Sequence, residues 1–197
     1  MTDNPEELTP HTDGDGYEQT PAKARRINRG VTAVIAVILV ALAVTLIVLF
    51  FFVTPYVVSG ESMMPTLHNG DHIMVQKVGY TVSRGDIILF ERPGSDKPPV
   101  KRVIAVAGDS VQFDGQNWLV NGEVLQEDYI LTAEYESDYV SPFTCDSAEI
   151  ADMITNGFTL GEGELFVLGD NRNNSYDSHR YGAISSDWVI GKVVNVY

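Results

Sequence analysis

The sequence predicts a mostly β domain, an antiparallel sheet or partial barrel, that follows one N-terminal transmembrane helix. Residues 31–53 form an apolar run without any charge that is long enough to cross a bilayer. Residues 54–197 instead break into short alternating or apolar runs separated by Gly, Asp, Asn and Pro, which is typical of β-strands and tight turns. No helical stripe of comparable quality follows residue 53, so the sequence favours a β architecture.

The apolar run is best interpreted as an uncleaved membrane anchor. As a helix, residues 31–53 would extend roughly 35 Å at about 1.5 Å per residue, against a hydrocarbon core of about 30 Å. One alternative is a buried core helix, but such helices are rarely apolar on every face over this length. The other is a cleaved signal peptide, whose apolar region spans about 7–15 residues and ends in small residues. This run ends in three phenylalanines, Phe50 to Phe52.

Charge around the anchor predicts its orientation. Basic side chains precede it and no comparable cluster follows it: Lys23, Arg25, Arg26 and Arg29. The positive-inside tendency therefore places residues 1–30 in the cytoplasm, as a disordered acidic tail with a basic juxtamembrane cluster, and residues 54–197 outside. The predicted location is the cell membrane, with a single pass.

The overall charge limits the classes of partner. The 197 residues include 13 Lys and Arg against 27 Asp and Glu, a net charge of −14, which argues against nucleic acid. Cys145 is the only cysteine, so no disulfide can form within the chain.

Strand and turn signals divide the domain further. Strands are expected at 72–77, 86–91, 100–107, 111–113, 118–120, 165–168 and 188–196. Two of these runs, 87–90 and 103–106, are continuously apolar, as in strands buried on both faces. Asn121-Gly122 predicts a two-residue hairpin turn. Residues 126–163 are acidic, turn-rich and weakly patterned, and are expected to be an inserted loop region.

Three polar clusters carry candidate chemistry. Ser62 lies in the turn-rich segment 59–67, only nine residues after the anchor, so it must stay close to the membrane surface. Lys101 lies at the start of the expected strand 100–107, just before its apolar run. Desolvation there lowers the pKa of an amine and lets a neutral lysine act as a base. Residues 169–182 form a glycine- and asparagine-rich polar loop. Serine–lysine pairing is a recognised variant of the serine protease arrangement.

In their residues and in their order along the chain, four segments resemble those of type I signal peptidases, the membrane-anchored serine–lysine proteases that cut signal peptides from exported proteins. These blocks are 59–67, 85–90, 101–109 and 169–182. The resemblance implies that Ser62 is the nucleophile and Lys101 its general base. It also implies a supporting role for Ser175, which would orient the lysine, and for the carboxylates of Asp170 and Asp177. Met63 matches a residue that lines the substrate cleft.

The chain departs from the family pattern at two points. Gly60 stands where some members have a serine that completes the oxyanion hole, so the Ser62 backbone N–H would supply one donor and the second is left open. The usual Asp-Ser-Arg reads Asp177-Ser178-His179-Arg180. Either Arg180 reaches Asp177 or His179 takes its place, and the permanent charge of Arg180 favours it.

The resemblance implies a serine endopeptidase that needs no metal and no cofactor, acting on signal-peptide-bearing preproteins beside the lipid bilayer, with export machinery as a further possible partner. The alternative is a catalytically silent relative that assembles surface proteins. A self-cleaving repressor shares serine–lysine chemistry, but the sequence offers no DNA-binding element. An anchored β domain without an active site would require the four blocks to be coincidence.

Overall fold

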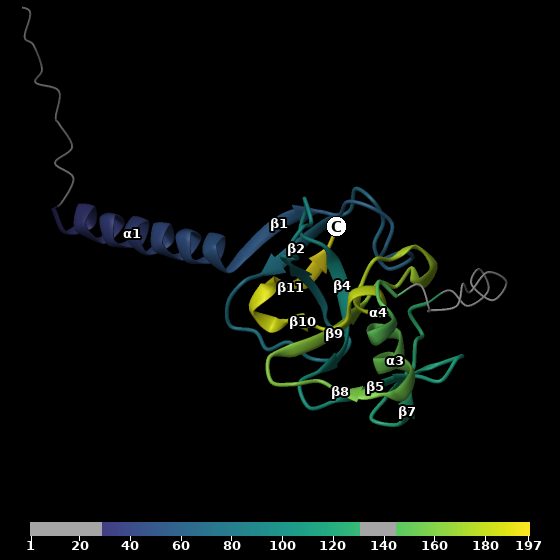
Figure 1. The fold of residues 1–197 in the computed structure, drawn as a ribbon. Helices are drawn as coiled ribbons and strands as arrows, with labels where there is room; N and C mark the ends of the chain where they lie inside the picture. Colours follow the sequence, from purple (N-terminus) through teal and green to yellow (C-terminus); the bar gives the residue numbers. More distant parts are fainter. Residues whose placement is uncertain (1–28, 131–144) are drawn as a thin grey trace, which may run out of the picture. The chain divides into compact units, whose positions relative to one another are not determined.

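The computed structural model describes residues 29–130 and 145–197. The predicted cytoplasmic tail therefore lies almost entirely outside the described residues, as does the middle of the predicted inserted loop region. Figure 1 shows the elements in chain order. They are α1 Arg29–Phe52, β1 Val53–Val57, β2 His72–Gln76, β3 Ile87–Phe90, β4 Val100–Val106, β5 Ser110–Phe113, β6 Trp118–Val120, β7 Glu123–Val124, α3 Ala148–Asn156, β8 Phe158–Thr159, β9 Glu164–Leu168, α4 Ser178–Tyr181, β10 Ile184–Ser185 and β11 Val189–Val196, with 3₁₀ turns at Arg172–Asn174 and Ser186–Trp188.

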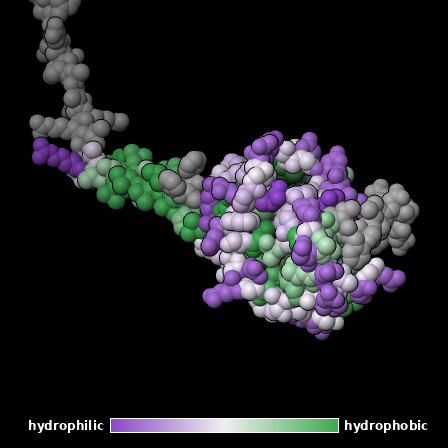
Figure 2. Space-filling model, in the orientation of Figure 1, coloured by the Kyte–Doolittle hydropathy of each residue, from purple (hydrophilic) through white to green (hydrophobic). Residues whose placement is uncertain are grey.

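Helix α1 is apolar on all sides. The segment Arg29–Val48 has a mean hydropathy of 3.1 and none of it is buried. Side chains around the helix such as Val37 and Val40 are more than 60% exposed, and Figure 2 shows the apolar surface that they form. By length and composition this helix can cross a membrane, where an all-round apolar surface is stable.

Two antiparallel sheets make up the β domain. The larger has seven strands in the order β1-β2-β11-β3-β4-β9-β10, and the smaller has the order β7-β6-β5-β8. The larger sheet is a curled half-barrel, so the predicted mostly β partial barrel is confirmed. Bulges interrupt the pairing of β4 with β9 and of β11 with both of its neighbours, and bulges of this kind add local bend and twist to a sheet.

The two central strands divide the core into separate clusters. In β4, Val103 packs into a cluster with β3 and β9, while Ile104 packs into the cluster beneath the smaller sheet. In β3, Leu89 packs with β2 and the segment after β1, and its neighbour Phe90 packs on the other side. The continuously apolar runs are therefore buried on both faces, as the sequence predicted.

The structure contains all seven predicted strands, with small shifts at their ends. The hairpin is also confirmed, because Asn121 and Gly122 both have positive φ, 56° and 79°, as a type I′ turn requires. Strand β1 was not predicted. It contains Pro55, and it pairs only with β2 at the edge of the sheet, where a missing N–H is tolerated.

The predicted inserted loop region contains a short helix that the sequence analysis did not predict. Helix α3 lies within the predicted inserted loop region, and the hydroxyl of Ser147 caps it by accepting the Ile150 N–H at 3.3 Å. Ile154 is buried in the core beneath the smaller sheet. Strand β8 follows and pairs with β5, so the end of this region belongs to the folded core.

Candidate active site

Ser62 lies on a short loop whose two ends are hydrogen-bonded to each other. Val58 donates its N–H to Asp71 O at 2.8 Å, and Gly70 donates back to Val58 O at 2.9 Å. Beyond Ser62, Met63 and Leu67 are buried at 1% and 0% exposure. The apolar side chains after the serine therefore anchor the loop in the core and leave the Ser62 hydroxyl at its surface.

Lys101 lies on β4 opposite Ile88 and is only 3% exposed. Its Nζ is 2.5 Å from Ser62 Oγ, within hydrogen-bond distance. Burial lowers the pKa of Lys101 to about 8, although the carboxylates of Asp177 and Asp170 act in the opposite direction. The amine is thus held next to the hydroxyl and loses its proton far more readily than an exposed lysine.

The polar loop predicted at 169–182 lies against this pair. Asp177 is fully buried and accepts hydrogen bonds from the Ser175 hydroxyl and, at 2.7 Å, from the Gly169 N–H. Burial alone would raise the pKa of Asp177, but hydrogen bonds led by that of His179 outweigh it and hold the pKa below its ordinary value. Asp177 is therefore a buried anion that orders the loop.

Ser175 does not contact the lysine in the expected way. Its hydroxyl donates to Asp177, and within residues 29–130 and 145–197 no hydrogen bond joins Ser175 to Lys101. Ser175 is nonetheless close to the nucleophile loop, because a Cβ added at Gly169 would lie 2.2 Å from Ser175 Oγ and 2.4 Å from Ser62 O. Gly169 is the point at which the two loops touch.

The expectation that Arg180 pairs with Asp177 is wrong, because His179 takes this place. His179 Nδ1 lies 2.6 Å from Asp177 Oδ1. Asp177 is the N-cap of α4, and its carboxylate accepts the His179 N–H, so the side chain two residues on lies over it. Arg180 reaches away, with its guanidinium 5.9 Å from the Tyr176 ring and its Nε without a partner in the described part of the chain.

Replacing His179 by alanine is expected to lower the free energy of unfolding by about 2 kcal/mol, because a buried carboxylate loses its charge-assisted hydrogen bond. Thermal unfolding of the two proteins measures this loss. Arg180→Ala is the matched control and should change stability by less. Equal losses in the two variants would contradict the assignment of His179.

The second carboxylate, Asp170, is bound from the opposite face of β4. Arg102 donates to it from Nε at 2.8 Å and from Nη2 at 2.5 Å, and the Thr66 hydroxyl donates at 2.5 Å. Arg102 also donates to Gly85 O at 3.0 Å. Because neighbouring side chains on a strand point to opposite faces, Lys101 contacts Ser62 while Arg102 clamps the loop that carries Asp170.

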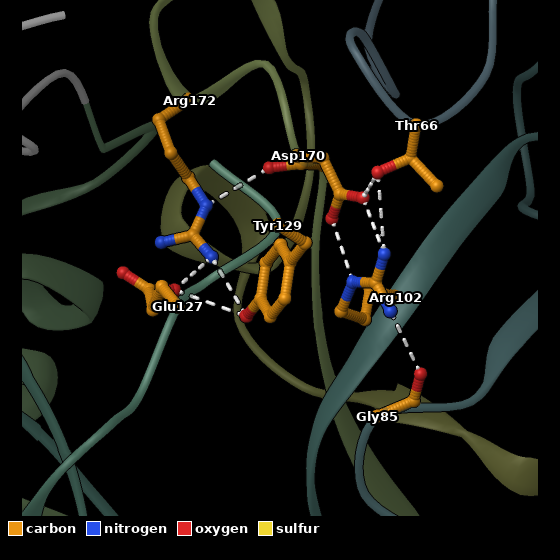
Figure 3. A network of polar contacts seen from close by, with 8 residues as sticks. Thr66, Gly85, Arg102, Glu127, Tyr129, Asp170 and Arg172 are labelled. Carbon is orange, nitrogen blue, oxygen red and sulfur yellow. Dashed lines mark hydrogen bonds and ion pairs between the residues drawn. The ribbon is translucent and has the colours of Figure 1, made fainter. Parts of the chain in front are cut away.

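Three residues that the sequence did not single out extend this network (Figure 3). The Tyr129 ring lies 4.0 Å from the Arg102 guanidinium carbon. Arg172 pairs with Glu127 and donates from Nε to Gly169 O at 2.9 Å. The start of the predicted inserted loop region is thus bound to the site. Its acidic, turn-rich sequence concealed this, since a glutamate and a tyrosine in such a segment look solvated.

The oxyanion position has one identified donor. Gly60 has a φ of 98° and its N–H donates to Asn69 Oδ1 at 2.9 Å, so this N–H is already occupied. Among the described residues no acceptor bonds the N–H of Ser62. The Ser62 N–H thus remains the expected donor, and the second stays unassigned.

Two cavities meet at Ser62 and Lys101. One, of about 340 Å³, has mostly apolar walls that include Tyr56, Met63 and Leu89. The other, of about 580 Å³, is polar and includes Asn69, Arg92, Asn174 and Tyr176. Met63 lines the apolar cavity, and its place in a substrate cleft stays a prediction.

In the described ranges, no group of three or more His, Cys, Asp or Glu residues is arranged to hold a metal ion. The expectation that the chain needs no metal and no cofactor stays a prediction.

Comparisons with known proteins identify the family. Residues 31–197 match the family described as signal peptidase, peptidase S26. Signal peptidase IB of Staphylococcus aureus strain COL is 35% identical over 164 residues, 79% of this chain and 85% of that protein. A probable signal peptidase I-1 of Synechocystis is 35% identical over 168 residues, 80% of this chain and 77% of that protein.

Among solved structures, a signal peptidase I from Enterococcus faecalis V583 is 30% identical, with a TM-score of 0.46, and the match covers 59% of this chain and 98% of that one. The match to the family over most of the chain and the identity to the curated relatives decide the assignment: the chain belongs to the signal peptidase family, peptidase S26.

Proposed function

We propose that this protein is a membrane-bound serine endopeptidase that removes N-terminal signal peptides from preproteins by a Ser62–Lys101 dyad. The observation that carries the proposal is the 2.5 Å contact between Ser62 Oγ and the Nζ of a lysine that is only 3% exposed. A nucleophilic hydroxyl needs a neighbouring base, and a buried amine can serve as one at a pH near neutrality.

The reaction is an acyl transfer. Ser62 Oγ attacks the scissile carbonyl carbon as its proton passes to Lys101 Nζ, and the Ser62 N–H stabilises the oxyanion. When the C–N bond breaks, Lys101 returns the proton to the leaving amine. Water then attacks the ester, Lys101 takes a proton from it, and the collapse of this intermediate restores the Ser62 hydroxyl and frees the signal peptide.

The other sequence blocks would act by positioning. Asp177 and Ser175 hold the loop that touches the Ser62 segment at Gly169. Asp170 joins that loop to β4 through Arg102. Both carboxylates would thus keep the lysine-bearing strand and the serine-bearing loop at a fixed separation, to which reaction rates are sensitive.

The apolar cavity supports specificity for small residues before the cleaved bond. Its walls include Met63 and Leu89, which suit the small side chains of an Ala-x-Ala pattern. The apolar helix α1 supports a single-pass anchor, and the basic residues that precede it favour a cytoplasmic N-terminus with the catalytic domain outside. Substrate and enzyme would then share the bilayer, which raises their effective concentration.

Cleavage of a preprotein with an Ala-x-Ala site tests the proposal. The full chain, in detergent or in lipid vesicles, should release the mature protein with the expected N-terminus by mass spectrometry. Ser62→Ala should lower kcat/KM by at least about 10³-fold, whereas Ser83→Ala, at an exposed serine, should leave it unchanged. A wild-type chain that binds preproteins but never cuts them would favour the catalytically silent alternative.

A further inference from the structure

Arg92 lies in the loop between β3 and β4 and is half-buried. Its central carbon is 4.7 Å from the ring centroid of Tyr176 and 5.0 Å from that of Tyr181. Stacking on two aromatic faces fixes the direction of an arginine side chain. The Tyr176 ring is itself held, because its hydroxyl donates to Asp146. Arg92 is therefore a positioned cation.

Within the described part of the chain, Arg92 makes no ion pair. Its counterparts Arg84, Arg102 and Arg172 each pair with a carboxylate. Glu91 and Asp96 border a further cavity together with Arg92, but neither forms an ion pair with it among the described residues, and Asp146 accepts the Tyr176 hydroxyl. A permanent charge that is held in place and lacks a carboxylate partner is a strong site for an anionic group.

Arg92 faces the polar cavity that begins at the catalytic pair. Ser62, Lys101 and Arg92 all line this cavity, and its walls also include Asn69, Asn174 and Tyr176. Its volume of about 580 Å³ is that of a cleft that holds a short peptide segment. The exposed Glu61 also borders it and would oppose an incoming acid, but from the solvent-screened rim.

The two cavities assign a direction to the substrate. They share Ser62 and Lys101, so a scissile carbonyl at Ser62 Oγ lies where they meet. Small apolar side chains before the cleaved bond belong in the apolar cavity. The residues after the bond then extend into the polar cavity, toward Arg92. This step rests on the proposed function.

We propose that Arg92 binds an acidic side chain within the first few residues after the cleaved bond and makes the enzyme prefer substrates with Asp or Glu there. The guanidinium fork matches a carboxylate in two parallel hydrogen bonds, and lysine or arginine at the same position is repelled. The stacked tyrosines hold the fork in place, so little rotamer entropy is lost on binding.

The test uses preprotein-derived substrates that are identical up to the cleaved bond and carry Asp, Asn or Lys at each of the first few positions after it. For the wild-type chain, kcat/KM should be about tenfold higher with Asp than with Lys at the position that reaches Arg92. Arg92→Gln should abolish this ratio, Arg92→Glu should invert it, and Arg92→Lys should retain part of it. The ratio should also shrink as salt is raised.

Lys77→Gln is the matched control, since Lys77 borders neither cavity and changes the net charge equally. It should leave the ratio unchanged.

The Asn substrates separate the two proposals. If they are cut but Asp and Lys substrates are cut equally well by wild-type and Arg92→Glu chains, the Arg92 proposal is wrong and the protease assignment stands. If no substrate is cut, the protease assignment itself fails.

Discussion

Lys101→Met will lower kcat/KM for preprotein cleavage by at least about 10³-fold and leave the fold intact. Methionine matches the length and volume of the lysine stem, and replacing a buried amine by an apolar group is often neutral or stabilising. By the proposed mechanism, the variant loses only the base that takes the Ser62 proton. Cleavage rates and thermal unfolding, measured on the same preparation, separate the loss of chemistry from loss of fold.

Two further variants sharpen this result. Lys101→Arg keeps a positive charge but cannot accept a proton, so it should be as inactive as the methionine variant. Lys77→Met removes a lysine away from the cavities and should be fully active. Retention of activity in Lys101→Arg would show that the residue acts by its charge and would contradict its role as a base.

The wild-type pH profile tests the same residue without mutation. In the proposed mechanism Lys101 acts when neutral, and burial lowers its pKa from 10.5 to about 8. Below that pH kcat/KM should fall about tenfold per pH unit as the amine becomes protonated, and above it the profile should level off. An ascending limb centred near pH 6 would point to another base.

Gly169→Ala will lower kcat/KM by about 10²-fold or more. The added methyl group would lie 2.2 Å from Ser175 Oγ and 2.4 Å from the Ser62 carbonyl oxygen, distances that real Cβ atoms do not tolerate. One of the two loops must move, and displacement of a catalytic group by about 1 Å costs on the order of 10²-fold. Steady-state kinetics should show the loss mainly in kcat.

Gly161→Ala is the matched control for this change. Its added Cβ would meet only the end of the flexible Glu164 side chain, at 3.3 Å, so kinetics should be close to those of the wild type. If Gly169→Ala also retained full activity, the close contact between the Ser62 loop and the Ser175 loop would not matter for the reaction.

Short-range pattern was sufficient for most of the fold. Continuous apolar runs identified β3 and β4, and Asn121-Gly122 identified its hairpin, because periodicity and turn chemistry act over a few residues. The pattern failed where that local signal was weak. Strand β1 carries Pro55, and α3 has only nine residues with a short apolar face of Ile150, Met153 and Ile154, so neither gives a long periodic signal.

The sequence likewise predicted only part of the candidate site. Sequence blocks identified Ser62 and Lys101, although 39 positions separate them, and the fold brings them to 2.5 Å. The sequence did not identify the contacts of Glu127 with Arg172 and of Tyr129 with Arg102. Nothing local distinguishes Glu127 and Tyr129 from residues of a solvated acidic loop. The sequence also favoured the wrong partner for Asp177.

By itself, then, the sequence determined the apolar helix, the mostly β class and the residue types of the proposed dyad, because these depend on composition and near neighbours. The tertiary structure alone decided that His179 rather than Arg180 meets Asp177, and that Gly169 lies where two loops touch. The first result depends on how side chains are directed at the N-cap of α4, and the second on how two loops pack. Both are set by contacts between segments that lie far apart in the chain.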